Sequence, residues 1–220
     1  MIRYMNNKQK LKKLQSSLEK LYSNYSSELL FHGWHHIWFV RNKALEFARP
    51  IKADLFLVES AALTHDLNYI VKVFTTAKEG EKLRSSILTK CGYSNSEITK
   101  IEHIIQETET SKRGKSISKE GMALSDGDSL FKVMPITPIL FASKYISESK
   151  IDITILANKI VSEQRKLLDE GFFFYTKMAK DKYLPWAKNQ VYLWETVTDA
   201  LKDKDIKQVL TIAKKWKILP

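Results

Sequence analysis

Apolar residues recur at steps of three and four along almost the whole chain, and this spacing constrains the fold more than any other feature. In the first such segment, one helical face carries Leu11, Leu14, Leu18, Leu21 and Tyr25. No segment sustains the alternation of apolar and polar residues that is typical of a half-buried strand. The chain also has only 7 Gly and 5 Pro, too few for a turn-rich β-sandwich. The sequence therefore predicts an all-α protein.

The same periodicity predicts a series of helices in one domain that covers residues 1–220. Gly33 interrupts the pattern, and Pro50 ends the following helix because proline disfavours helix in the residue before it. We expect helices at about 11–25, 34–48, 53–67, 80–90, 97–107, 121–134, 139–147, 151–168, 184–201 and 205–216. The segment SKRGKSISK at 111–119 is expected to be the one long loop.

Composition narrows the choice of metal ligands and partners. Cys91 is the only cysteine, so an intrachain disulfide and a zinc site with three thiolates are excluded, and a metal must be held by His, Asp and Glu. No apolar run is long enough to span a bilayer, and the segment MIRYMNNKQKLKKLQ lacks the apolar core of a secretory signal. We therefore expect a cytoplasmic protein without a membrane partner. The net charge of +11 favours anionic partners: phosphate esters, nucleotides or nucleic acid.

Four of the five histidines lie between positions 32 and 65. His36 shares a helical face with Val40 and Ala44, so its side chain should point into the core. His65 falls on the apolar face of the next helix, and Asp66 follows it directly. A single inward histidine is more often a hydrogen-bonded core residue than a metal ligand. Two of them beside a carboxylate make a metal site the better interpretation.

A second pair of carboxylates, Asp126 and Asp128, stands in SDGDSLF at the beginning of another apolar helical face. Burial of a carboxylate is costly unless it is paired or coordinates a metal. Two imidazoles and two carboxylates suit a divalent ion that keeps open positions for water and substrate. The residue types therefore predict a metal site of histidines and carboxylates.

These motifs resemble those of the HD-domain metal-dependent phosphohydrolases. The likeness covers about residues 31–131 and is weaker at 170–197. The C-terminal helices at 139–217 would pack on this core. AALTHDL is very similar to the segment that carries the His-Asp pair in that family, and His32 matches a histidine found in one of its subgroups. The resemblance implies a single-domain helical bundle of the HD type. It also implies one divalent ion (Mn, Mg, Co, Ni, Zn or Fe) and four ligands: His36, His65, Asp66 and Asp128.

The resemblance further implies how the chain would act. Asp126 is the second choice for the last ligand, since Asp128 stands in the expected Asp-x-Leu context. Water activated by the ion would attack phosphorus, and Asp66 or Asp126 would accept its proton. We therefore expect hydrolysis of a phosphate ester or anhydride, of a small nucleotide. Charge on the phosphoryl group would be neutralised by basic residues that flank the ligand-bearing segments: Arg41, Lys72, Lys78, Lys82 and Arg84.

The chain departs from the family pattern at two places. Many members have an acidic residue shortly after the His-Asp pair, where this chain has LNYI at 67–70, and Asn68 there could orient a water but not carry its proton. Members of the subgroup often have Arg before the valine that follows the first ligand. Here Phe39 occupies that place, and Arg41 follows Val40.

Two other functions compete with hydrolysis. The HD fold also includes proteins that hold two irons and oxidise substrates with O₂. Such a site would need extra ligands, and His32, His35 and His103 are available for it. Alternatively, the basic helical domain binds nucleic acid without catalysis, with a steep dependence on salt.

Overall fold

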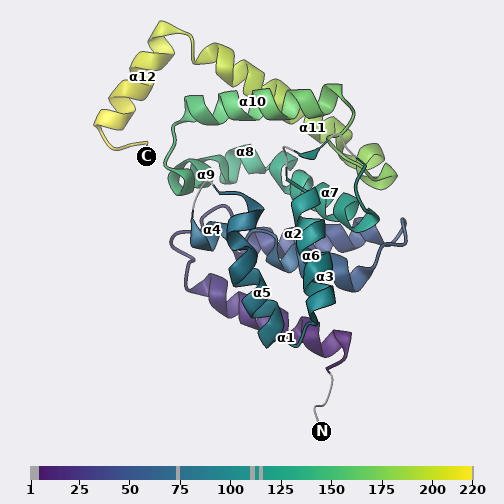
Figure 1. The fold of residues 1–220 in the computed structure, drawn as a ribbon. Coiled ribbons are helices and arrows are strands. Elements are labelled where there is room, and N and C mark those ends of the chain that lie inside the picture. Colours follow the sequence, from purple (N-terminus) through teal and green to yellow (C-terminus); the bar gives the residue numbers. More distant parts are fainter. Residues whose placement is uncertain (1–4, 73–74, 110–111, 114–115, 220) are drawn as a thin grey trace.

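The computed structural model describes residues 5–72, 75–109, 112–113 and 116–219, and every regular element in this part of the chain is a helix (Figure 1). The prediction of an all-α fold is therefore confirmed. Of the expected loop at 111–119, residues 111, 114 and 115 lie outside the described part. The elements in chain order are α1 (Asn7–Ser23), α2 (Trp34–Ala48), α3 (Leu55–Thr64), α4 (Asn68–Val71), the 3₁₀ helix η1 (Ala77–Gly80), α5 (Glu81–Lys90), α6 (Asn95–Glu107), α7 (Lys119–Val133), α8 (Thr137–Leu140), α9 (Ala142–Ser149), α10 (Ile153–Asp169), α11 (Lys177–Ala200) and α12 (Lys204–Lys215).

Several helices begin where a polar side chain accepts from their free backbone N–H groups. Ser94 caps α6, and the Glu97 carboxylate accepts from the backbone N–H of Ser94, which completes a capping box. Asp54 caps α3 by accepting from the backbone of Phe56 and Leu57. The capping box explains why α6 starts within two residues of the expected position. Helix α2 has the bounds expected from its apolar face, although no side chain caps its start.

Helices α2 and α7 form the centre of the molecule and approach each other closely at Gly127. A Cβ at this position would lie 3.0 Å from both the carbonyl oxygen of Val40 and the backbone nitrogen of Ala44. The hydrogen atom of glycine therefore lets the two helix backbones come together. This packing places the residue after Gly127 next to the first turn of α2.

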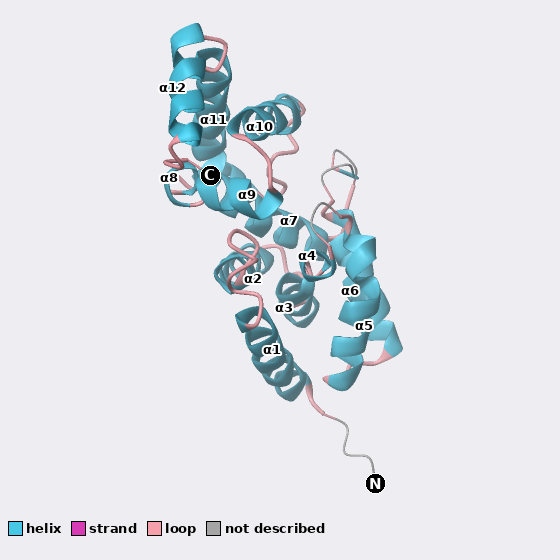
Figure 2. Cartoon of the chain, turned by 90° about the vertical axis from the view of Figure 1, so that its left-hand side faces the viewer, coloured by secondary structure: helices cyan, strands magenta, loops and turns pink. Residues whose placement is uncertain are grey.

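The C-terminal helices form a separate layer with its own apolar cluster. Figures 1 and 2 show α8–α12 gathered at one end of the molecule and α1, α3 and α5 toward the other. Leu156, Ala157 and Trp194 are the buried residues of this second cluster, between α10 and α11, whereas the main core joins α1–α7 to the start of α11. The outermost helix, α12, buries none of its residues.

The sequence expectation and the structure differ most at three places. Helix α3 ends at Thr64, and the short α4 follows the turn that carries His65 and Asp66. Phe141 separates α8 from α9, where one helix was expected. Helix α11 begins at Lys177, seven residues earlier than expected. The sequence expectation placed the start of the helix at Pro185, but Pro185 lies inside α11 on its exposed side, where the missing N–H does not disturb the core. No helix in the described residues is both long enough and apolar enough to cross a membrane.

Candidate metal centre

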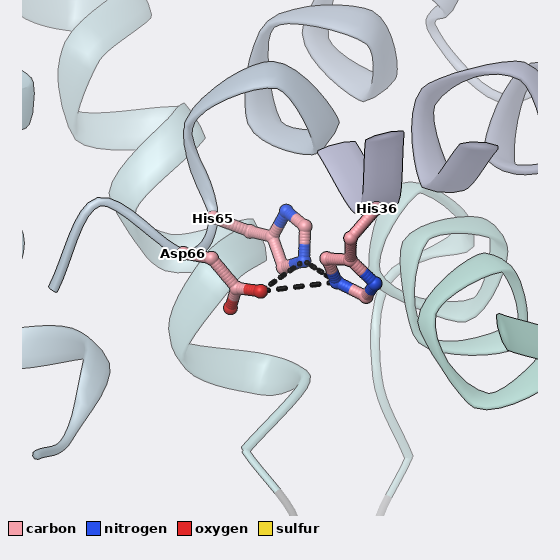
Figure 3. Close-up of side chains that lie close together, drawn as sticks. All are labelled: His36, His65 and Asp66. Carbon is pink, nitrogen blue, oxygen red and sulfur yellow. Dashed lines mark hydrogen bonds and ion pairs between the residues drawn. The ribbon is translucent and has the colours of Figure 1, made fainter. Parts of the chain in front are cut away.

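His36, His65 and Asp66 converge from three neighbouring segments (Figure 3). His36 lies in the first turn of α2, His65 caps the C-terminus of α3, and Asp66 follows in the turn to α4. The Nε2 atoms of the two histidines are 3.3 Å apart. Asp66 Oδ2 lies 3.0 Å from Nε2 of His36 and 3.2 Å from Nε2 of His65. One cation at ordinary ligand distances of about 2.0–2.2 Å could touch all three atoms.

The surrounding protein orients the two imidazoles. His65 Nδ1 lies 2.8 Å from the carbonyl oxygen of Ala62, so it carries the proton and leaves Nε2 free for a cation. His36 is fully buried, and Phe131 packs edge-on against its ring. Its Nδ1 has no hydrogen-bond partner among the described residues. Both Nε2 atoms therefore face the same oxygen of Asp66.

Asp128 lies beside this cluster without completing it. Its Oδ1 is 3.7 Å from His36 Nε2, and its Oδ2 accepts from Lys132 Nζ at 2.7 Å. The set of ligand atoms that all lie within 4.8 Å of one another contains only the other three residues. The structure thus brings three of the four expected ligands together and puts the fourth at the edge, where it is shared with a lysine.

The charges of the site suit a cation. Burial lowers the pKa of His36 to about 4, although the Asp66 carboxylate acts in the opposite direction. Burial would raise the pKa of Asp66, but the two histidines hold it well below its usual value. Burial likewise opposes ionisation of Asp128, and Lys132 and His36 outweigh it and lower that pKa to about 2. Neutral His36 beside ionised carboxylates is in the protonation state in which these groups bind a metal. Burial opposes a proton on His65, but the Asp66 carboxylate outweighs burial and raises the pKa of His65, so a metal there would displace a proton.

Two hollows meet at the cluster, and Asp66, Tyr69 and Asp128 line both. The inner cavity, of about 180 Å³, runs from the cluster toward α10 and α11. The outer pocket, of about 610 Å³, is more open and more polar. Basic side chains line both hollows: Lys132 and Lys159 in the inner cavity, and Arg113, Lys132 and Lys166 in the outer pocket.

None of the five basic residues expected to bind phosphate lines either hollow. Arg84 is fully buried and donates to Glu102 and to the carbonyl oxygen of Ala77, so its assignment to substrate is wrong. Arg41 pairs with Glu59 of α3 and lies over the ring of Trp38, so it is not at either hollow and its assignment stays a prediction. Three further lysines are exposed and line neither hollow: Lys72, Lys78 and Lys82.

The basic residues at the site are instead those that line the two hollows. One of them had a sequence signal, because Lys132 stands one helical turn after Asp128.

Asp126 has a different task from the one expected of it. Its carboxylate is fully buried and accepts from the backbone N–H of Tyr175 at 2.7 Å, and from the N–H and hydroxyl of Thr176 at 2.8 and 2.6 Å. Burial raises its pKa to about 6 in spite of these bonds. Asp126 lines neither hollow, because residues two apart on a helix point to nearly opposite sides. It ties α7 to the start of α11, and its assignment as a proton acceptor or ligand is corrected.

Replacement of Asp126 by asparagine is expected to destabilise the protein without affecting the site. One carboxylate oxygen becomes an NH₂ group, which cannot accept from Tyr175 or Thr176, so at least one buried donor loses its partner. We expect the free energy of unfolding to fall by about 1–3 kcal/mol, as measured by urea denaturation. Asp181→Asn, at an exposed position, is the matched control. A loss of activity without a loss of stability would return Asp126 to a catalytic role.

The three remaining histidines differ in their placement. His32 is buried and lines the inner cavity. Its Nδ1 lies 2.5 Å from Oε1 of Glu148, and its ring stacks on Tyr69 at 3.7 Å. His35 is exposed and stacks on Phe141, away from both hollows. His103 is 70% exposed beside Glu107 and lines neither hollow, so it is not placed to supply an extra ligand to the cluster. Of the three, only His32 is placed to serve a second metal.

Sequence reasoning missed Glu148 altogether. This residue of α9 also accepts from the backbone N–H groups of Phe31 and His32, at 2.6 and 3.2 Å. It therefore fixes the segment that precedes α2 and orients the His32 ring. The two partners are 116 residues apart, and no local pattern announces their contact.

Comparison with known proteins finds bacterial proteins that share the fold of this chain. The sequence matches no protein-family model. It is 36% identical over 103 residues to YpgQ of Bacillus subtilis strain 168, an uncharacterised protein, and the match covers 45% of this chain. The chain thus spans about half the length of the curated relative it matches.

Solved structures resemble it over nearly the whole chain. A Lactobacillus plantarum protein superposes with a TM-score of 0.62 at 21% identity, over 88% of this chain and 95% of the other. The B. subtilis YpgQ structure, in complex with ADP, gives a TM-score of 0.58 at 22% identity, over 88% and 96%. Lin1889 from Listeria innocua gives 0.55 at 19% identity, over 91% and 97%. These similarities show a shared fold.

Proposed function

We propose that this chain is a metal-dependent phosphohydrolase that cleaves a phosphate ester or anhydride of a small nucleotide. The observation that carries the proposal is the convergence of His36, His65 and Asp66 at the junction of two hollows that basic side chains line. Two nitrogens and a carboxylate suit a borderline divalent ion. Phosphoryl transfer needs such a cation together with further positive charge around the transferred group. The resemblance to the HD-domain phosphohydrolases supports the same reaction.

Each residue of the site has a task in this reaction. His36, His65 and Asp66 would hold the ion, with Asp128 at its edge. When bound, the ion lowers the pKa of a coordinated water and polarises a phosphoryl oxygen. Asp66 Oδ2 faces the two histidines and its other oxygen, Oδ1, points away from them (Figure 3). We assign to Oδ1 the acceptance of the proton that the attacking water loses.

Lys132 is the residue best placed to neutralise the phosphoryl group. It lines both hollows and already contacts Asp128 at 2.7 Å. A phosphate oxygen beside Asp128 would therefore meet an ammonium that needs little movement to reach it. Lys159 in the inner cavity and Arg113 in the outer pocket add positive charge on either side.

The proposed substrate class is a nucleotide, and one protein of the same fold has been solved with such a ligand. The solved B. subtilis YpgQ is a complex with ADP. At 22% identity this likeness shows only that the two proteins share a fold. The net charge of +11 favours an anionic ligand independently of it. The basic side chains of the two hollows stand among a larger number of carboxylates, so the proposal relies on the bound ion to favour phosphate there.

The test is a panel of nucleoside mono-, di- and triphosphates, assayed after treatment with a chelator and after addition of Mn, Mg, Co, Ni, Zn or Fe. We expect hydrolysis to stop in the chelator, to return with at least one of these metals, and to accompany one bound ion per chain. Two irons per chain with O₂-dependent oxidation would support the di-iron function instead. Nucleic-acid binding that is steeply salt-dependent, indifferent to the chelator and without hydrolysis would support the non-catalytic one.

A further inference from the structure

We propose that the inner cavity binds the nucleobase of the substrate and that Gln164 and Trp194 recognise the edge of the base. This inference rests on the proposed function for the phosphate end of the substrate, and it concerns the opposite end. Gln164 belongs to α10 and Trp194 to α11, so the recognising residues come from the C-terminal layer, outside the segments that carry the metal ligands.

The cavity has the size and walls of a site for one heterocycle. It begins at Asp66 and Asp128 and ends against the second apolar cluster, where Leu156, Ile160 and Trp194 line it. Its volume of about 180 Å³ is slightly above that of an apolar cavity of about 150 Å³ that takes up benzene. The cavity therefore has room for one ring system but not for a whole nucleotide.

Polar atoms without partners are concentrated around the site. Among the described residues, seven buried side-chain nitrogen and oxygen atoms have no hydrogen-bond partner. Gln164 Oε1 and Trp194 Nε1 belong to residues that line the inner cavity, and Arg113 Nε belongs to one that lines the outer pocket. Burial of such atoms costs stability unless a ligand pairs with them. Trp194 is only 4% exposed, so bulk water does not replace that ligand.

The two inner atoms select for the edge of a base. An indole N–H only donates and an amide oxygen only accepts, so the complementary ligand presents an acceptor and a donor. A phosphate offers acceptors alone, and its charge disfavours the apolar end of the cavity. A ribose offers both functions but has no flat apolar face. A nucleobase offers both and can also stack on Tyr145 or Trp194.

Binding measured without turnover tests the proposal. The intact protein is titrated calorimetrically, in EDTA, with the four ribonucleoside 5′-monophosphates and with ribose 5-phosphate. We expect at least one nucleotide to bind at least about tenfold more tightly than ribose 5-phosphate. Gln164→Met and Trp194→Phe, each close in shape to the original, should each weaken that nucleotide by about tenfold and leave ribose 5-phosphate unchanged.

Exposed residues of the same types provide the matched controls. Gln208→Met and Trp216→Phe lie at the C-terminal end of the chain, away from the cavity, and should change neither affinity. Circular dichroism confirms the fold of each variant, and the two cavity variants test the proposal independently if one of them fails to fold. Equal affinity for all nucleotides and ribose 5-phosphate, or an equal loss for both kinds of ligand in the variants, would overturn the base site. Because the titration contains EDTA, failure of the proposed hydrolysis would leave these affinity ratios intact.

Discussion

Asp66→Ala is expected to remove both metal binding and hydrolysis. The carboxylate supplies one of the three converging ligand atoms, and in our proposal its second oxygen accepts the proton of the attacking water. A metal-activated water accounts for several kcal/mol of transition-state stabilisation, and each 1.36 kcal/mol is a factor of ten in rate. We therefore expect kcat/KM to fall by about 10²–10³-fold or more, and the metal content per chain to fall with it, as measured by elemental analysis.

The structure of the variant should remain intact. Asp66 lies in the turn between α3 and α4, and its carboxylate contacts the two histidines of the cluster. Asp181→Ala removes an exposed carboxylate of α11 and should leave both metal content and kcat/KM unchanged. A folded Asp66→Ala protein with a full complement of metal and undiminished activity would reject the proposed function.

Arg84→Met should cause a larger loss of stability than the loss expected for Asp126→Asn. The guanidinium is fully buried and donates from Nε and Nη2 to the two oxygens of Glu102 at 2.8 and 2.7 Å. Methionine fills a similar volume but leaves the Glu102 carboxylate buried without a countercharge. Removal of one partner of such a pair costs about 3–5 kcal/mol, a large share of the roughly 5–15 kcal/mol that holds a domain folded. Guanidinium denaturation would measure this loss.

Two companion proteins separate the ion pair from other effects. Lys82→Ala, two positions earlier on α5 and exposed, should change the free energy of unfolding by no more than about 0.5 kcal/mol. Arg84→Met combined with Glu102→Leu should recover most of the lost stability, because no buried charge is then unpaired. Unchanged stability with a raised KM for phosphate substrates would instead return Arg84 to substrate binding.

The elements and the ligand-bearing faces could be predicted because helical periodicity is a local property. His36 and His65 each lie on the apolar face of a helix, and both are buried, as expected. The same rule separates Asp126 from Asp128, since positions two apart on α7 point to nearly opposite sides. Both residues were candidates from the sequence because both are carboxylates of one segment, and the Asp-x-Leu context, not the helical phase, made Asp128 the first choice as ligand. Helix α11 is an exception to prediction from local sequence. Pro185 is typical of a helix start, yet the helix begins eight residues before it, at Lys177.

The basic residues were harder to predict because tertiary packing decides which of them reach the site. Arg84 lies close in sequence to the ligand-bearing segments, but it also stands four residues before the buried Leu88. Glu102 likewise falls on the apolar face of α6 between Ile98 and Ile105. Opposite charges on two apolar faces are a signal for a buried ion pair. The contact between His32 and Glu148 has no comparable signal in the sequence, because the two residues meet only in the tertiary packing of the C-terminal layer.

The single hydrogen atom at position 127 sets the spacing between the two helices that carry His36 and Asp128. Any other residue there would press a methyl group or more against the carbonyl of Val40 and the backbone of Ala44. The helices would have to separate, and the distance between the two side chains would grow with them. A side chain at position 127 would therefore alter the candidate metal centre without touching any of its ligands.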